Sequence, residues 1–468
     1  MLTSRLEHDF LGERAIPANA YYGIQTLRAL ENFNITGIPL KSEPLFVQAL
    51  GYVKKAAALA NRDMGVLDPA LADYIAQACD WVIAGEMDEQ FQTDMIQGGA
   101  GTSVNMNANE VIANVALELM GHPKGAYEFC HPNNHVNCSQ STNDAYPTAF
   151  RIALSNKLVG YSQALGELAD AFAQKGEEFR NVLKMGRTQL QDAVPMSMGD
   201  EFKAFATNLR EELLRIQDSR NLISEINMGA TAIGTRVNAP TGYAEAVTEH
   251  LRTITGLELV LAGDLIEATY DTGAYVQLSG VLKRTAVKLS KICNDLRLLS
   301  SGPRAGLFEI NLPPLQPGSS IMPGKVNPVV PEVVNQTAFY VIGADLTVTM
   351  AAEAGQLQLN VMEPVISFAL FTSISYLTRA CHTLREKCVV GITANAHHAE
   401  KLVRNSIGIV TQLNPVLGYE TAAEIAKEAL RTGKNVYDIA VTERHLLTQE
   451  KWDEIFTFEN LIRPHYIQ

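Results

Sequence analysis

Long stretches of helical periodicity constrain the fold of this chain more than any other feature of its sequence. Residues 150–183 contain no proline, and apolar side chains recur among them at helical spacing. The stripe consists of Ile152, Leu154, Leu158, Leu165, Leu168, Phe172, Phe179 and Val182. Comparable runs cover 201–226, 264–301 and 329–390, the last with breaks around Gly355 and Pro364. Helices this long bury their stripes against one another, so the sequence predicts an all-α, mainly helical fold with a bundle of long helices.

Charge and composition exclude several classes of protein. The chain has 468 residues, 47% of them hydrophobic, which is enough for a large core and more than one domain. Its net charge of -13 argues against a nucleic-acid or anionic-membrane partner, because such binding needs clustered Lys and Arg. No apolar run approaches the roughly 20 residues of a membrane span, and the start, MLTSRLEHDFLGER, lacks the apolar core of a signal peptide. Six scattered cysteines without a C-x-x-C pair are typical of a cytoplasmic protein, which we expect this to be.

The segment PGSSIMPGKVNP, residues 317–328, partly matches a nucleotide phosphate-binding loop. That motif, G-x-x-x-x-G-K-[ST], has four residues between its glycines and a metal-binding hydroxyl after its lysine. Here five residues separate Gly318 from Gly324, and Val326 follows Lys325. The preceding NLPPLQ carries two prolines, which suit a loop rather than a buried strand. The segment is therefore not a phosphate-binding loop of this type.

Three further segments, 97–107, 136–144 and 186–195, share the polar character of 317–328. Their hydroxyl and amide side chains, with one lysine, suit a small anion with several oxygens, such as a dicarboxylate. The set comprises Thr102, Ser103, Ser141, Thr142, Asn143, Thr188, Gln189, Ser319, Ser320, Lys325 and Asn327. Helix capping is the alternative, for example by Asn143 and Asp144, but four such segments favour a binding site. No thiol nucleophile or flanking histidine occurs in them, so a Ser-His-Asp hydrolase is not predicted.

The segment GSSIMPGKVNP resembles the signature loop of the aspartase/fumarase superfamily, whose members eliminate a group from a substituted succinate to leave fumarate. Other segments resemble the family's blocks, in family order: QGGAGTSVNMNANEVIAN, SQSTNDAYPT, GRTQLQDAVP, NMGATAIGT, NDLRLLSSGPRAGL and NVMEPVI. The opening DFLGERAIPANAYYGIQTLRALENF and the late SIGIVTQLNP extend the resemblance over essentially the whole chain.

Within the superfamily, SSGPRAGLFEINLP and AEAGQLQLNVMEPVI resemble the aspartase branch, which implies reversible deamination of L-aspartate to fumarate and ammonia. Fumarases typically carry histidine where this chain has Gln189, and the argininosuccinate and adenylosuccinate lyases usually read MPQKKNP in the signature. Two alternatives stay open. One is a class II fumarase or an ammonia-lyase for a substituted aspartate. The other is a non-catalytic structural homologue, against which the intact Ser319, Lys325 and Asn327 argue.

The resemblance also implies a role for each site residue. The β-carboxylate and its dianionic form would be held by Thr102, Ser141, Thr142 and Ser320, the α-carboxylate by Lys325 and Asn327, and the amino group by Asn143, Thr188 and Gln189. Ser319 would be the base that removes the C3 proton. A serine base needs backbone N–H groups and a nearby cation to stabilise its alkoxide, and Lys325 is the cation of the loop. Glu332 either pairs with an active-site group or stabilises a helix dipole.

The family fold has three domains, expected here at 1–141, 142–395 and 396–468. Family members are homotetramers whose active sites draw residues from three subunits. No organic cofactor is implied. Some aspartases are activated by a divalent metal, and no ligand cluster in the sequence decides this: His131 and His135 lie in HPNNH, whose Pro and Asn residues predict a loop rather than a metal site.

One block departs from the family pattern. It usually reads GTG, an apolar residue and Asn, whereas here Arg236 stands in place of the second glycine. If that position requires a positive φ, the arginine costs about 1 kcal/mol. The substitution also bears on the choice of substrate.

Overall fold

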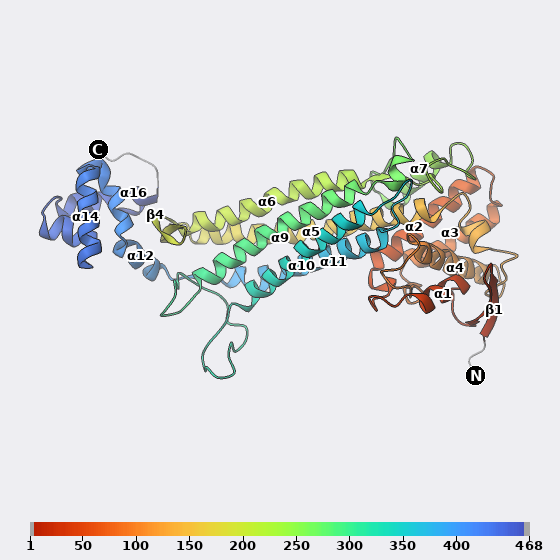
Figure 1. The fold of residues 1–468 in the computed structure, drawn as a ribbon, viewed down its shortest axis with the longest axis horizontal. Helices are drawn as coiled ribbons and strands as arrows, with labels where there is room; N and C mark the ends of the chain where they lie inside the picture. Colours follow the sequence, from red (N-terminus) through yellow and green to blue (C-terminus); the bar gives the residue numbers. More distant parts are fainter. Residues whose placement is uncertain (1–3, 463–468) are drawn as a thin grey trace. The chain divides into compact units, whose positions relative to one another are not determined.

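The computed structural model describes residues 4–462, and most of them are helical (Figure 1). The strands within these residues form four two-stranded sheets. The pairs are β1 (Ser4–Asp9) with β2 (Gly12–Pro17), β3 (Leu183–Thr188) with β4 (Gln191–Ser197), β5 (Glu225–Ile226) with β6 (Val260–Leu261), and β7 (Ile310–Asn311) with β8 (Thr393–Ala394). The predicted mainly helical fold is confirmed.

Five long helices match the predicted periodic runs. They are α5 (Thr142–Glu178), α6 (Met198–Ile223), α9 (Gly273–Leu299), α10 (Val329–Glu353) and α11 (Glu363–Lys387). The prediction of one run over 264–301 is wrong, because α8 (Glu267–Tyr270) ends before α9 begins. Asp271 Oδ2 accepts the Gly273 N–H at 3.0 Å, a local turn that competes with helix continuation. The break near Gly355 falls at 354–362, and Pro364 lies in the first turn of α11, where a missing N–H is tolerated.

Helix α5 begins earlier than its apolar stripe suggests and contains Pro147. A proline at this position cannot donate the backbone hydrogen bond to the Asn143 carbonyl four residues before it. The Asn227 side chain supplies the missing donor, with its Nδ2 3.0 Å from that carbonyl oxygen. The helix therefore continues through the proline to Thr142.

The chain divides into two compact units, and the five long helices contribute segments to both. Unit 1 comprises Met1–Ser162, Leu214–Arg284 and Phe339–Leu377. Unit 2 comprises Gln163–Leu213, Thr285–Ala338 and Thr378–Gln468.

Unit 1 also contains shorter helices, which gather at one end of its long-helix segments (Figure 1): α1 (Ile24–Asn32), α2 (Pro44–Asp63), α3 (Pro69–Ile83), α4 (Thr102–Leu119) and α7 (Tyr243–Thr255). Every residue of α4 from Val104 to Leu117 is buried. An aromatic cluster joins α2 to the long helices: the Phe46 ring lies 5.3 Å from the rings of Tyr146 and Phe371, centroid to centroid. Such pairs stabilise a fold by about 0.5–1.5 kcal/mol each beyond their buried area.

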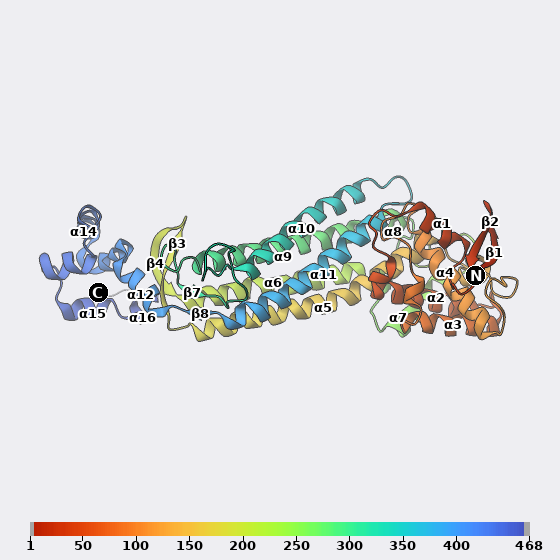
Figure 2. The same ribbon diagram turned by 90° about the horizontal axis from the view of Figure 1, so that it is seen from below.

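Unit 2 is built around the other segments of the long helices. Phe172 of α5 packs against Phe202 and Phe205 of α6, with ring centroids 6.2 and 5.6 Å apart. Five short helices follow: α12 (Ala396–Asn405), α13 (Asn414–Leu417), α14 (Tyr419–Thr432), α15 (Gln449–Ile455) and α16 (Phe458–Ile462). Their apolar side chains share a core with Leu183 and Met185 of β3, beside which they lie (Figure 2).

The predicted domain limits coincide with helix starts, because α5 begins at Thr142 and α12 at Ala396. The division into three domains stays a prediction. Within residues 4–462, no helix has both the length and the apolar character needed to cross a bilayer.

Candidate active site

The signature loop, residues 317–328, lies in unit 2 between β7 and α10 and is closed by its own backbone. The Gly318 N–H donates to the Lys325 carbonyl at 2.7 Å, and Asn327 Nδ2 donates to the Gly318 carbonyl at 2.8 Å. A Cβ on residue 318 would lie 2.7 Å from the Lys325 oxygen, so the close approach requires glycine. Gly324 has a φ of +82°, a left-handed value that also favours glycine.

Ser319 lies where two backbone N–H groups converge. Its Oγ accepts the N–H of Ile321 at 3.2 Å and that of Met322 at 3.0 Å. Donors aimed at an oxygen stabilise negative charge on it and lower its pKa. These two contacts form a local serine turn, and the role of Ser319 as the base stays a prediction.

Three of the predicted residues of the loop, Ser319, Lys325 and Asn327, line two cavities in unit 2. Ser319 and Lys325 line one of about 440 Å³, and Lys325, Asn327 and Glu332 line another of about 550 Å³. Lys325 and Ser320 are exposed. Glu332 occupies the first turn of α10, where a carboxylate interacts favourably with the helix dipole.

The GRT block forms the β3–β4 hairpin, with Thr188 and Gln189 at its tip. Gln189 and Leu190 form a two-residue turn, and their φ values of 54° and 63° are both left-handed. Neither residue is glycine or asparagine, so the turn is strained, as backbone at functional sites often is. The fully buried Glu309 forms ion pairs with two residues of β3: Arg187 near the tip, whose Nη1 lies 2.7 Å from Oε1, and Lys184 near the base, whose Nζ lies 3.4 Å from Oε2. In the described part of unit 2, neither Thr188 nor Gln189 makes a side-chain hydrogen bond.

Ser141, Thr142 and Asn143 lie at the N-terminus of α5 in unit 1. Ser141 caps the helix, because its Oγ accepts the Asn143 N–H at 3.2 Å. Asp144 completes the reciprocal pair, since its Oδ1 accepts the Ser141 N–H at 2.9 Å. Its Oδ2 accepts the N–H groups of Gly229 and Thr231 at 3.2 and 2.8 Å. Burial raises the pKa of Asp144 to about 6, against the effect of these N–H donors.

The capping alternative is wrong for Asn143. Its Nδ2 donates to the Ala232 carbonyl at 2.7 Å, and its own carbonyl accepts from Asn227. One long-range contact therefore fixes the Asn143 side chain, and a second fixes its backbone carbonyl, to the segment that also carries Arg236.

Helix α4, which begins at Thr102, contacts Thr142 through a side chain that was not among the predicted site residues. Asn105, one turn into α4 from Thr102, donates through Nδ2 to Thr142 Oγ1 at 3.1 Å. Lys54 of α2 lies behind it and donates to Asn105 Oδ1 at 2.7 Å. Thr102 donates its own hydroxyl hydrogen to the Gly99 carbonyl at 2.7 Å, so donation to a substrate requires that the hydroxyl rotate. The sequence does contain one sign of a buried functional lysine: Lys54 lies in GYVKKAAALA, whose small apolar residues predict a buried helix, and lysine is rarely buried.

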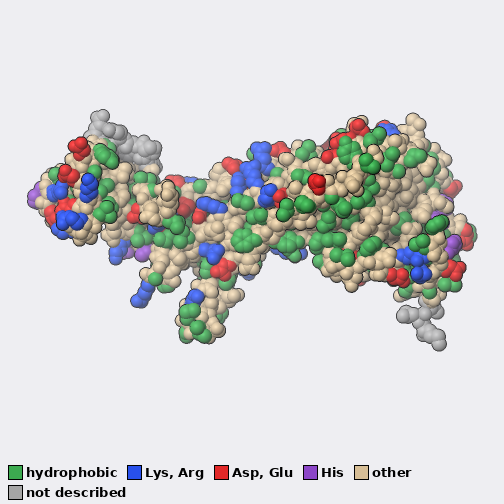
Figure 3. All heavy atoms as spheres, in the orientation of Figure 1, with side chains coloured by type: hydrophobic (Ala, Val, Ile, Leu, Met, Phe, Trp, Pro, Cys, Tyr) green, Lys and Arg blue, Asp and Glu red, His purple; other side chains and the backbone are tan. Residues whose placement is uncertain are grey.

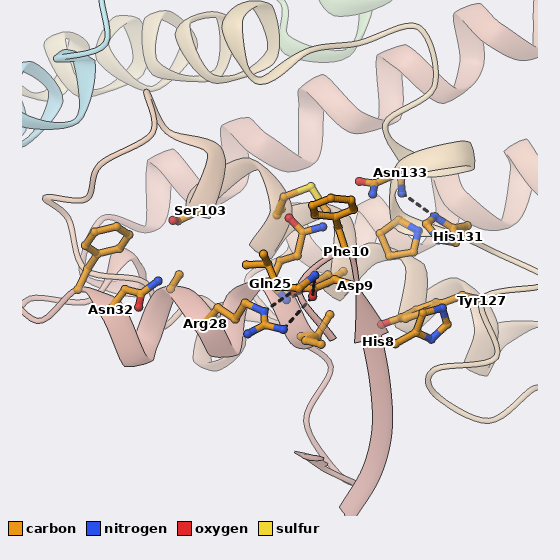
Figure 4. Close-up of a pocket in the computed structure, with 17 residues that line it drawn as sticks. His8, Asp9, Phe10, Gln25, Arg28, Asn32, Ser103, Tyr127, His131 and Asn133 are labelled. Carbon is orange, nitrogen blue, oxygen red and sulfur yellow. Dashed lines mark hydrogen bonds and ion pairs between the residues drawn. The ribbon is translucent and has the colours of Figure 1, made fainter. Parts of the chain in front are cut away.

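A polar cavity of about 570 Å³ in unit 1 is lined by Ser103, the residue after Thr102 (Figure 4). Arg28 and Asp9 form a bidentate pair on its wall, with nitrogen–oxygen distances of 2.7 and 2.8 Å. The hydrogen bond from Arg28 holds the pKa of Asp9 below its usual value. His131 lies on the opposite side from Ser103 in this view.

The prediction of a loop at HPNNH is wrong, because Pro132–Val136 form one π-helical turn. The histidines hold this turn: His135 Nδ1 accepts the His131 N–H at 2.9 Å, and His131 Nδ1 accepts the Asn133 N–H at 3.0 Å. Burial lowers the pKa of both histidines. The Nδ1 atoms of both histidines therefore accept hydrogen bonds from backbone N–H groups of this turn.

Arg236 has a φ of +60°, the conformation that glycine adopts readily, and its Nη1 pairs with Glu245 Oε1 at 3.0 Å. We expect Arg236→Gly to be more stable than Arg236→Ala by about 1 kcal/mol, because both lose the ion pair but alanine keeps the strained φ. Unfolding of the two variants by denaturant tests this. An alanine variant as stable as the glycine variant would show that the position carries no strain.

Proteins of known family match this chain over most of its length. The family model described as "Lyase" matches residues 12–343, and "Fumarase C C-terminus" matches residues 409–463. The chain is 59% identical over 461 residues to the aspartate ammonia-lyase of Helicobacter pylori strain J99, which covers 98% of each protein. It is 58% identical over 463 residues to that of Escherichia coli K12, covering 99% of this chain and 97% of the relative.

Among solved structures, the fold is similar to that of a fumarate lyase:delta crystallin from Brucella melitensis bound to cobalt. The TM-score is 0.95 and the identity 54%, over 98% of this chain and 99% of that chain. The predicted family is confirmed: this chain belongs to the aspartase/fumarase family of lyases.

Proposed function

We propose that this protein is an aspartate ammonia-lyase, which converts L-aspartate reversibly to fumarate and ammonia. The observation that carries the proposal is the 58–59% identity, over 98–99% of the chain, to proteins named aspartate ammonia-lyase. Gln189 in the GRT block, where fumarases typically carry histidine, supports this branch over the fumarases.

The reaction is an anti-elimination through an enediolate-like dianion. Ser319 removes the C3 proton, and its alkoxide is stabilised by the N–H groups of Ile321 and Met322 and by the charge of Lys325. Negative charge then develops on the β-carboxylate, and its return toward C3 forms the C2–C3 double bond while the C2–N bond breaks and ammonia leaves with that bond's electron pair. A million-fold acceleration corresponds to about 8 kcal/mol of transition-state stabilisation, and one preorganised donor contributes about 3–4 kcal/mol. A few convergent donors therefore suffice.

The donors have separate tasks in this proposal. The β-carboxylate is held by Thr102, Ser141, Thr142 and Ser320, the α-carboxylate by Lys325 and Asn327, and the amino group by Asn143, Thr188 and Gln189. The hydrogen bonds at the start of α5 and within the signature loop support preorganisation, because they fix the backbone that presents these side chains.

The active protein is a homotetramer in which three subunits contribute to each site. An exposed apolar face on α10 supports this assembly: Phe339, Leu346 and Met350 are between 60% and 63% exposed. The charged residue of 333–350 is Asp345, which is buried. Figure 3 shows hydrophobic side chains exposed along the long helices. Apolar surface of this extent marks a protein–protein interface.

Three further features complete the proposal. The chain has three domains, 1–141, 142–395 and 396–468. It acts in the cytoplasm, supported by six cysteines that are all free thiols. It requires no organic cofactor. Activation by a divalent metal stays open, because the Brucella melitensis relative was solved with cobalt. Residues 4–462 of this chain contain no group of three or more His, Cys, Asp or Glu side chains placed to hold a metal.

A substrate panel tests the proposal. Fumarate absorbance and ammonia release are measured with L-aspartate, L-malate and 3-methylaspartate in turn. We expect fumarate and ammonia in equal amounts from L-aspartate. Fumarate from malate, or turnover of methylaspartate alone, would move the function within the family, and no turnover of the three would favour the structural homologue.

A further inference from the structure

Lys54 of α2 is a buried lysine whose hydrogen-bond acceptors are neutral amides. Its side chain is 0% exposed. A lysine has three N–H donors and no acceptor, and a charge taken out of water costs free energy unless its donors are satisfied. Lys54 Nζ donates to Asn105 Oδ1 at 2.7 Å, to Asn137 Oδ1 at 3.0 Å and to Gln140 Oε1 at 2.8 Å. All three donors are therefore used on amide oxygens.

This arrangement determines which way the Asn105 amide faces. Because Lys54 can only donate, Asn105 must turn its oxygen toward the lysine and its Nδ2 away. The two Nδ2 hydrogens go to Thr142 Oγ1 and Asn137 Oδ1, both at 3.1 Å. Thr142 Oγ1 therefore accepts a hydrogen bond, which leaves its own hydroxyl hydrogen free to donate elsewhere.

We propose that Lys54 is a positioning residue that directs the chain Lys54–Asn105–Thr142 and so presents the Thr142 hydroxyl as a donor to the developing dianion. The inference rests on the proposed function, in which Thr142 holds the β-carboxylate. Hydrogen bonds in a chain polarise one another, so the charge of Lys54 strengthens the donation from Thr142. The effect is larger inside the protein than in water, because the dielectric constant there is low.

The titration of Lys54 agrees with this role. Burial lowers its pKa to about 7, while Asp144 and Cys79 act in the opposite direction. Substrate charge that accumulates at Thr142 raises the pKa again, because a nearby anion favours the charged lysine. The transition state and the protonated lysine therefore stabilise each other.

Replacement of Lys54 by methionine, which has similar length and no charge, tests the inference. Lys55→Met is the matched control: it removes one positive charge from the adjacent residue, whose Nζ pairs with Asp80 at 2.5 Å. We measure kcat for L-aspartate and inhibition by succinate, which carries both carboxylates but cannot eliminate. We expect kcat to fall about tenfold to hundredfold in Lys54→Met, with the succinate inhibition constant changed less than about threefold. Lys55→Met should retain about the full activity.

A second variant decides the question if Lys54→Met does not fold. Asn105→Asp keeps the side-chain shape and gives Lys54 a counter-ion, so we expect an unchanged or higher melting temperature. It also removes the N–H that faces Thr142, so kcat should again fall at least about tenfold. Full kcat in Asn105→Asp or in folded Lys54→Met, or an equal loss in Lys55→Met, would overturn the inference. Absence of fumarate formation by the unmodified enzyme would instead overturn the proposed function.

Discussion

Ser319→Ala is expected to lower kcat for L-aspartate by about 10³- to 10⁴-fold, which lies at the upper end of what a general base contributes. The variant keeps Gly318, Lys325 and the backbone bonds that close the loop, so substrate should still bind. We expect the inhibition constant of succinate to change less than about threefold. Initial rates from fumarate absorbance at saturating L-aspartate provide the measurement.

The adjacent serine provides the matched control for this prediction. Ser320→Ala removes the same hydroxyl from the next residue, which in the proposed roles binds the β-carboxylate and accepts no proton. Its kcat should fall less than that of Ser319→Ala, by about 10²-fold, the loss of one donor. If Ser319→Ala retains more than a tenth of the kcat, another group takes the proton.

Two variants that are inactive alone are expected to regain activity when they assemble into mixed tetramers. Ser319→Ala lacks the base of the signature loop, and Thr142→Val lacks a donor at the start of α5. If a site takes these two blocks from different subunits, random mixing leaves about a quarter of the sites intact, since each block is unmodified with a probability of one half. We expect about a quarter of the unmodified activity after co-expression and purification through a different tag on each variant.

Two substitutions within one block provide the control for mixing. Ser319→Ala and Lys325→Ala both alter the signature loop, so a site always receives one damaged loop and activity should stay absent. Recovery in this control would indicate contamination. If the Ser319→Ala and Thr142→Val mixture stays inactive, the two blocks act within one subunit, and the shared-site prediction is wrong.

The long helices could be predicted because their apolar stripes repeat at the helical period over many turns. Their ends could not be predicted as well. Nothing near Pro147 in the sequence shows that Asn227, eighty residues later, supplies the donor that lets α5 continue. The break before α9 depends on one side-chain contact, that of Asp271 with the Gly273 N–H, which a periodicity pattern does not register.

The four polar segments that carry the candidate site could be recognised in the sequence, but the side-chain interactions that support them could not. Lys54 belongs to a helix with ordinary local sequence, and Asn105 lies in the polar segment 97–107 without standing out from it; their role depends on packing between α2, α4 and the start of α5. The strained turn at Gln189 is also hidden, because Gln-Leu is not a usual two-residue hairpin turn. Tertiary contacts override local preference at these positions, as is common at functional sites.

The reverse reaction in deuterium oxide shows directly whether ammonia is eliminated stereospecifically with Ser319 as the base. Fumarate and ammonium are incubated with the enzyme, and the amino acid formed is examined by NMR. We expect L-aspartate with a single deuterium at C3 in one configuration only, and none of this product with Ser319→Ala. Malate as the product, deuterium in both C3 positions, or unchanged labelling by Ser319→Ala would contradict it.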